Sequence, residues 1–252
     1  MWVERDGVRI NYSLIGDGPT VILHTGGAGD GAMWQEHLPY LRDFRLVLID
    51  HRGRGASSQP TTLSGHAMIE YVSDVVAVVA ELAVRRVGFV GYSMGAHIGY
   101  ELAATRPDLI ASLVGLGVTR EIVPQPDEDV ALAALVREHG LVALVNLVEE
   151  EERIALPEWL TQQFLDTNAE QFALSLEALK DWSVWPCFAR IECPTLIVAG
   201  EAEDPPHLNA VAATKIALAQ AVWLPGLGHV GAFLAAREQC QLIEPHLRST
   251  LR

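Results

Sequence analysis

The pentapeptide Gly91-Tyr92-Ser93-Met94-Gly95 sets one serine between two glycines, each two residues away from it. Residues 87–90 are apolar and favour a β-strand, whereas residues 94–105 are mostly apolar and favour a buried helix. A sharp turn from strand to helix crowds the positions two before and two after its corner, where glycine removes a Cβ that would collide with backbone. The pattern therefore predicts a serine hydroxyl exposed at a strained turn, beside a helix N-terminus.

A serine hydroxyl needs a general base to become a nucleophile, and that base needs a third group to orient it. Of the nine histidines, His229 is the predicted base, because it follows a strand-like run and a glycine-rich turn and precedes the last predicted helix. The acid is expected directly after the strand predicted at 195–199. Asp204, the first aspartate there, is the preferred acid, and the adjacent Glu203 is the alternative.

Acyl transfer from such a serine also requires N–H donors for the developing oxyanion. We expect one donor from Met94, the residue after the nucleophile. The second is expected from the loop at 24–30, HTGGAGD, whose glycines let the backbone approach a substrate closely. Gly26 is the predicted donor of this loop and Gly27 is the alternative.

These side chains have to be positioned by elements that alternate along the chain. Strands are predicted at 2–5, 8–14, 20–24, 45–50, 86–90, 110–116, 195–199 and 221–224, and helices at 32–41, 66–83, 94–105, 207–219 and 231–249. Such alternation indicates an α/β fold with a mostly parallel central sheet and helices on both faces. The nearly continuous apolar strands agree with burial of both faces.

The alternation stops between residues 121 and 190, where helices are predicted at 128–148, 157–166 and 168–181. We expect a helical cap (lid) insertion at 121–190, over the sheet edge at which α/β folds bind ligands. The core domain then comprises 1–120 and 191–252. The cap segment also carries the run EEEE at 149–152. Its candidate substrate-binding residues are Trp159, Phe164, Trp182 and Trp185, and packing of the cap onto the sheet is the alternative role for them.

Composition and charge exclude several classes of partner. The 252 residues carry a net charge of −14, which disfavours nucleic acid and anionic membrane surfaces. No apolar run approaches the roughly 20 residues of a membrane span, and the N-terminal residues contain no secretory signal. Cys187, Cys193 and Cys240 form neither a disulfide framework nor a zinc motif. We therefore expect a cytoplasmic protein that uses neither a metal nor an organic cofactor.

Taken together, the motifs resemble the α/β-hydrolase fold superfamily, in its branch of cap-bearing serine hydrolases that includes esterases and enol-lactonases. The matching segments follow the family's order and span nearly the whole chain: HTGG at 24–27, DHRGRGAS at 50–57, GYSMG at 91–95, GEAED at 200–204 and Gly228-His229. The resemblance implies a triad of Ser93, Asp204 and His229. Two departures are visible. The first glycine after the strand comes one place late, and Glu203 occupies the usual position of the aspartate.

The expected activity is hydrolysis of carboxylic esters of small, largely apolar substrates through an acyl-enzyme intermediate. The alternatives are an enol-lactonase, a C–C bond (β-diketone) hydrolase and a perhydrolase, which use the same constellation in similar proteins, or a non-catalytic small-molecule receptor. Ser93 argues against the dehalogenases and epoxide hydrolases of this fold, whose nucleophile is an aspartate. The expected partner is a small ester or lactone. The sequence leaves open the natural substrate and the oligomeric state, including a homo-oligomer.

Overall fold

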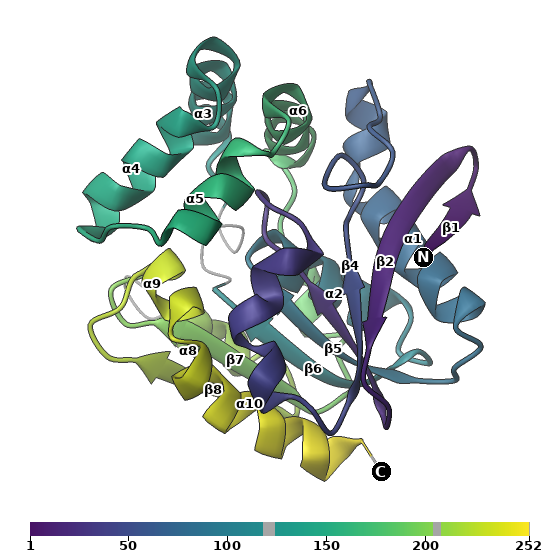
Figure 1. The fold of residues 1–252 in the computed structure, drawn as a ribbon. Helices are drawn as coiled ribbons and strands as arrows, with labels where there is room; N and C mark the ends of the chain where they lie inside the picture. Colours follow the sequence, from purple (N-terminus) through teal and green to yellow (C-terminus); the bar gives the residue numbers. More distant parts are fainter. Residues whose placement is uncertain (118–123, 204–207, 252) are drawn as a thin grey trace.

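The computed structural model describes residues 1–117, 124–203 and 208–251. Its centre is an eight-stranded sheet with the strand order β1-β2-β4-β3-β5-β6-β7-β8 (Figure 1). The strands are β1 (Trp2–Arg5), β2 (Val8–Ile15), β3 (Thr20–His24), β4 (Arg45–Ile49), β5 (Val87–Tyr92), β6 (Ile110–Leu116), β7 (Thr195–Gly200) and β8 (Ala219–Leu224). Only the pairs that involve β2 are antiparallel. The prediction of a mostly parallel sheet in an α/β fold is therefore confirmed.

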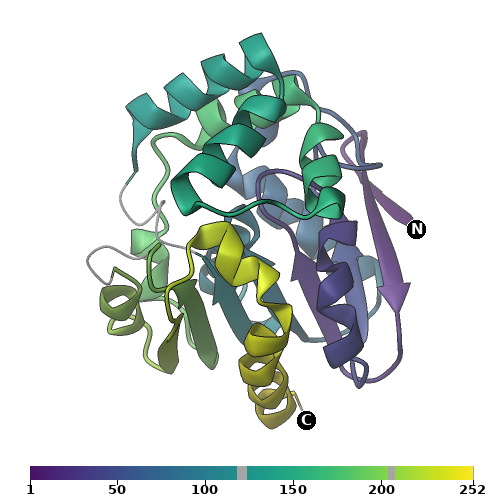
Figure 2. The same cartoon turned by 60° about the vertical axis from the view of Figure 1, so that its left-hand side comes forward.

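Helices cover both faces of this sheet, and each face has its own apolar core. Along β3, Val21 and Leu23 face one core and Ile22 faces the other, as the two-residue repeat of a strand requires. The first core includes residues of η1 (Gly31–Glu36), α9 (His229–Leu234) and α10 (Ala236–Thr250), and the second those of α1 (Met68–Glu81), α2 (Met94–Thr105) and α8 (Leu208–Ala213). Figure 2 shows η1 and α10 on the same face of the sheet. Both faces of the central strands are thus buried, which explains their unbroken apolar sequences.

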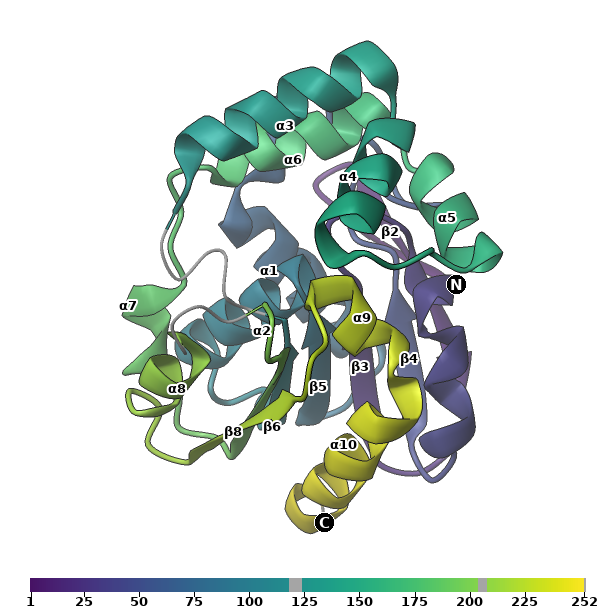
Figure 3. The ribbon, with the colours of Figure 1, turned by 90° about the vertical axis from the view of Figure 1, so that its left-hand side faces the viewer.

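Between β6 and β7, the described residues form five helices: α3 (Pro126–His139), α4 (Val142–Glu152), α5 (Glu158–Leu165), α6 (Ala169–Leu179) and α7 (Trp185–Phe188). We call α3 to α6 the helical layer. Figure 3 shows α3 and α6 side by side at the top of the molecule, with α4 and α5 beside them and α9 below α4. The layer therefore stands over the edge of the sheet at which the loops after β3 and β5 emerge.

Several predicted helices are shorter than expected or are divided in two. The predicted helix at 128–148 is divided between α3 and α4 because Gly140 adopts a φ of 72° and its N–H bonds to the carbonyl of Val136. The predicted helix at 231–249 is divided at Ala235, which has a ψ of 51°. Two short 3₁₀ helices, η1 and η2 (Leu38–Tyr40), replace the helix predicted at 32–41. A third, η3 (Leu63–His66), precedes α1.

None of the helices in the described part of the chain combines the length and the apolar character needed to cross a membrane.

Candidate active site

Ser93 stands at the corner between β5 and α2. Its backbone has a φ of 51° and a ψ of −120°, a strained conformation for a non-glycine residue, and its N–H bonds to the carbonyl of Leu116 at 2.7 Å. A Cβ at Gly91 would collide with the backbone of Gly95, and one at Gly95 would collide with the carbonyl oxygen of His24. The backbone around the turn is thus as crowded as the sequence predicted, and it leaves room only for glycine at positions 91 and 95.

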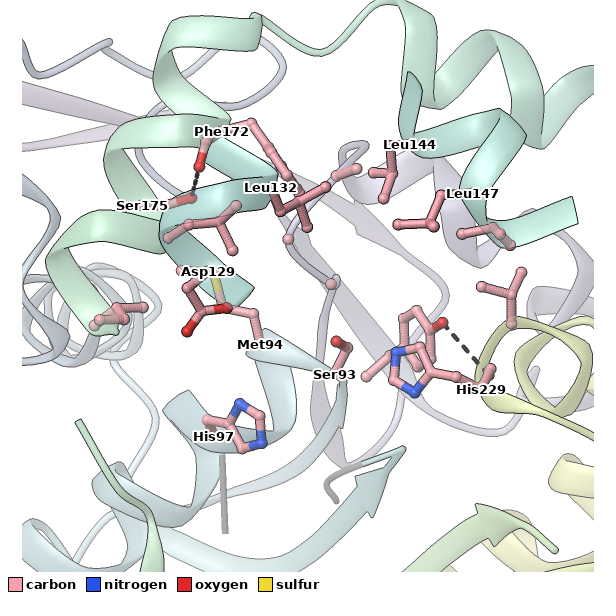
Figure 4. Close-up of a pocket in the computed structure, with 18 of the residues that line it drawn as sticks. Ser93, Met94, His97, Asp129, Leu132, Leu144, Leu147, Phe172, Ser175 and His229 are labelled. Carbon is pink, nitrogen blue, oxygen red and sulfur yellow. Dashed lines mark hydrogen bonds between the residues drawn. The ribbon is translucent and has the colours of Figure 1, made fainter. Parts of the chain in front are cut away.

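A cavity of about 470 Å³ lies between this corner and the helical layer. Ser93, His229, Gly26, Gly27 and Met94 all line it, and Figure 4 shows the Ser93 and His229 side chains next to each other at its base. Its walls are mainly apolar and include Leu132, Leu144, Leu147, Phe164, Phe172 and Trp182. The structure therefore brings the predicted nucleophile, base and oxyanion loop to one site.

Among the described residues, Glu203 contacts His229 through its carboxylate. Its Oε1 atom lies 2.9 Å from Nδ1 of His229, and its Oε2 atom accepts the N–H of Gly200 at 3.3 Å. The Glu203 side chain is only 6% exposed, whereas that of His229 is 35% exposed, so water reaches the pair from the side of the imidazole. The contact assigns the ring proton to Nδ1 and leaves the lone pair of a base on Nε2. Asp204, which the sequence favoured as the acid, lies outside the described residues.

Tyr92 contacts His229, and Gly117 leaves space for the imidazole; the sequence pattern predicted neither role. The Tyr92 ring stacks on the His229 ring with 4.9 Å between centroids, and its hydroxyl donates to the His229 carbonyl at 3.4 Å. A Cβ at Gly117 would lie 2.7 Å from the imidazole. The only sequence signal for Gly117 is a glycine directly after a predicted strand.

Burial keeps the Tyr92 hydroxyl neutral. It raises the pKa of Tyr92 well above the ordinary value, and the negative charges of Glu203 and Glu152 raise it further. The phenol therefore donates its hydrogen bond throughout the neutral range.

Arg54 supports the loop expected to donate to the oxyanion. Its Nε donates to the carbonyl of Gly27 at 2.6 Å, and its Nη2 donates to Ser175 Oγ of α6 at 3.0 Å. Burial lowers the pKa of Arg54 to about 10, so the guanidinium remains charged at neutral pH. One buried cation thus connects the loop at Gly26-Gly27 with the helical layer.

The neighbouring residues of the segment DHRGRGAS at 50–57 have a structural role. Asp50 accepts the N–H groups of Gly31 and Ala56 at 2.9 and 3.0 Å. Arg52 forms two bonds of 2.7 Å with Asp74 and a third, of 2.8 Å, with the carbonyl of Gly65. Arg52 therefore ties neighbouring loops together, as its fork of donors allows, and does not line the cavity.

Of the four aromatic residues predicted to bind substrate, Phe164 and Trp182 line the cavity, whereas Trp159 and Trp185 do not. Trp159 is half-buried against the first core. Trp185 is 37% exposed, because the short helix α7 turns Cys187 and Phe188 inward instead. The sequence prediction is corrected for these two tryptophans, because an apolar pattern shows neither whether a side chain is buried nor which surface it packs against.

His97 and Asp129, which the sequence analysis did not single out, also line the cavity. His97 lies on α2 with its ring 5.9 Å from that of Trp182, and Figure 4 shows Asp129 of α3 above Met94.

Within residues 1–117, 124–203 and 208–251, no cluster of three or more His, Cys, Asp or Glu side chains is arranged to hold a metal ion.

Comparison with known proteins shows the family. Residues 19–182 match the family described as the alpha/beta hydrolase fold. The chain is 30% identical over 209 residues to 3-oxoadipate enol-lactonase 2 of Acinetobacter baylyi. The aligned region covers 79% of this chain and 77% of that protein.

Solved structures show the same fold. The enol-lactonase from Burkholderia xenovorans LB400 superposes with a TM-score of 0.88 and 24% identity, over 98% of this chain and 100% of that one. An esterase from Exiguobacterium antarcticum gives a TM-score of 0.85 and 23% identity, over 96% and 97% of the two chains. The matched motifs, the sheet and these relatives together show that the chain belongs to the α/β-hydrolase fold family.

Proposed function

We propose that the protein is a serine hydrolase of small carboxylic esters, with Ser93 as nucleophile, His229 as general base and Glu203 as the acid that orients it. The observation that carries the proposal is the 2.9 Å contact between His229 and Glu203 at the base of the cavity that also contains Ser93. A nucleophile, an imidazole and an orienting carboxylate, the three groups that acyl transfer needs, come from three separate segments and line one cavity.

In the proposed mechanism, Ser93 Oγ attacks the ester carbonyl carbon while His229 Nε2 takes the hydroxyl proton. Glu203 stabilises the resulting imidazolium and keeps its own charge. The N–H groups of Met94 and of the Gly26-Gly27 loop bind the oxyanion. His229 then protonates the leaving alkoxide, and the alcohol departs from the acyl-enzyme. Water attacks the acyl carbon, gives a proton to His229, and the carboxylic acid leaves as Ser93 recovers its proton.

The apolar cavity walls support an acyl or alkyl group as the part of the substrate bound there. A lactone is the second candidate substrate, because the relative from Acinetobacter baylyi is named as an enol-lactonase. A lactone is a cyclic ester, so the same steps apply, and the alcohol produced stays attached to the acyl group.

We also propose that residues 121–190 act as a cap over a core of residues 1–120 and 191–252. The support for this proposal is that α3, α4, α5 and α6 all contribute residues to the cavity lining.

A cytoplasmic location is proposed as well. Its support is that Cys187, Cys193 and Cys240 are all free thiols, as is usual for proteins in a reducing compartment.

The test combines an active-site label with a substrate panel. A fluorophosphonate probe should modify the wild-type chain at Ser93, identified by peptide mapping, and p-nitrophenyl esters of short acids should give a burst of p-nitrophenol. Esters, lactones and β-diketones are then compared by kcat/KM. Ligand binding without labelling or a burst would instead favour the non-catalytic receptor.

A further inference from the structure

A glutamate of the helical layer bonds to the backbone next to His229. Glu152 is the last residue of α4, and its Oε1 accepts the N–H of Val230 at 2.6 Å. Its Oε2 accepts the N–H of Gly231 at 2.8 Å. These two residues directly follow His229 in the chain, so both carboxylate oxygens of one cap-side glutamate hold the segment that carries the base.

This contact gives a reason for the run EEEE at 149–152. Carboxylates at a helix C-terminus face the negative end of the helix dipole, which is unfavourable for the helix by itself. Two of the four side chains are used in contacts beyond α4: Glu149 accepts the N–H of Leu156 at 2.8 Å, and Glu152 accepts the two N–H groups of α9. Charge-assisted bonds of this kind are about twice as strong as neutral ones.

The α9 segment lacks an internal cap for these donors. Gly228, its N-cap residue, has no side chain to accept them, and the first N–H groups of any helix have no partner within the helix. Glu152 supplies the acceptors from a different part of the chain, 78 residues from Val230. Separation of α4 from α9 would leave both N–H groups without these acceptors and would loosen the segment that begins at His229.

Glu152 also lies close to the other groups that fix the base. It lines the same cavity as Ser93 and His229, and its charge contributes to the raised pKa of Tyr92, whose ring stacks on His229. We propose that Glu152 is a positioning residue: it orients His229 through the start of α9 and so makes the reactive geometry depend on contact between α4 and the core. This proposal rests on the proposed function.

The first test removes the carboxylate of Glu152 and compares this variant with one that lacks a neighbouring glutamate of the same run. Glu152→Ala should slow phosphonylation of Ser93 by a small dialkyl fluorophosphonate by about 10- to 100-fold per folded molecule, because displacement of a catalytic group by about 1 Å costs rates of that order. For p-nitrophenyl acetate, kcat should fall by the same factor and KM should change less. Glu152→Gln keeps one acceptor oxygen, so its phosphonylation rate should lie between those of the wild type and Glu152→Ala. Glu150→Ala changes an exposed member of the same run, which has no part in the site, and should match the wild type.

A second variant probes the same contact from the core side and does not depend on the folding of Glu152→Ala. A Cβ at Gly228 would lie 2.6 Å from Oε2 of Glu152, and the φ of Gly228, −84°, permits alanine. Gly228→Ala should therefore displace the glutamate and slow phosphonylation. In the double variant with Glu152→Ala the added methyl group has room, so the two effects should not add.

The outcomes separate the two proposals. Equal phosphonylation rates in the wild type, Glu152→Ala and Gly228→Ala, even with a lowered midpoint of thermal unfolding, would overturn the positioning role and leave Glu152 as a structural contact of the helical layer. Fully additive effects in the double variant would also overturn it. No labelling of the wild-type chain would overturn the proposed function itself, together with this inference.

Discussion

Glu203 approaches His229 to within 2.9 Å, although the two residues lie 26 positions apart on the loops that follow β7 and β8. β7 and β8 are parallel neighbours in register from Thr195 and Ala219 to Gly200 and Leu224, so both loops leave the same edge of the sheet. The pairing of these two strands therefore sets the distance between the carboxylate and the imidazole.

Ser93→Ala should lower ester turnover by at least about 10³-fold, because it removes the nucleophile and leaves only binding and oxyanion stabilisation. Labelling by a fluorophosphonate should disappear as well. Ser93→Gly should be equally inactive but should unfold with a free energy about 1 kcal/mol higher than that of Ser93→Ala, because glycine relieves the φ of 51°. Urea denaturation measures this difference. Retention of most of the activity by either variant would remove Ser93 from the mechanism.

Glu203→Gln should lower kcat by about 10²- to 10⁴-fold, since a neutral amide does not stabilise the imidazolium and disturbs the ring orientation. Asp204→Asn is the matched comparison and should have the smaller effect. Initial rates with p-nitrophenyl esters decide the ranking. A larger loss in Asp204→Asn would assign the acid role to the aspartate that the sequence favoured.

Gly117→Ala should reduce activity because its Cβ would lie 2.7 Å from the His229 ring. The φ of Gly117 is +63°, so alanine there also strains the backbone by about 1–2 kcal/mol. Gly7→Ala separates the two effects: Gly7 has a φ of +79° and nothing within 4 Å of an added Cβ. Both variants should lose stability in thermal unfolding, and only Gly117→Ala should lose turnover. Equal kcat values in the two variants would contradict the proposed contact.

Arg54→Lys should lower kcat/KM by about 10-fold, because one ammonium group cannot reproduce the fork that holds Gly27 and Ser175 together. Ser175→Ala removes only the bond to the helical layer and should cost less. The ratio of the two losses, measured with one ester, tests the link between Arg54 and the oxyanion loop. If Ser175→Ala were the more harmful change, Arg54 would act through the helical layer instead.

Stability should fall as the pH is lowered from about 6.5 towards 4. Burial lowers the pKa of His24 and of His37 to about 4, so the folded state keeps both neutral, while the unfolded chain binds protons from its ordinary pKa of about 6.5. Each such histidine lowers the free energy of unfolding by about 1.4 kcal/mol per pH unit in this window.

Urea unfolding at several pH values measures this dependence. His24→Phe keeps a ring in the stack with His51 and Phe89 and should reduce the slope. A free energy of unfolding that stays constant between pH 6.5 and pH 4.5 would contradict the prediction.

The sequence by itself determined the strands and the corner at Ser93. The apolar periodicity predicted every strand of the sheet, and the glycines around Ser93 predicted the turn, because both depend on steric effects within a few residues. The motif set predicted a hydrolase of this fold, and the comparisons confirm that prediction.

Only the tertiary structure decided which distant side chains meet. The contact of Glu203 with His229, the stacking of Tyr92 on a ring 137 positions away, and the bond of Glu152 to Val230 across 78 positions depend on strand register and loop paths. For the adjacent carboxylates Glu203 and Asp204, the local signals disagreed: residue type favoured Asp204, whereas the spacing of the family motif favoured Glu203. A carboxylate is placed against an imidazole by the packing of the whole sheet edge, and residue type and spacing alone do not encode that geometry.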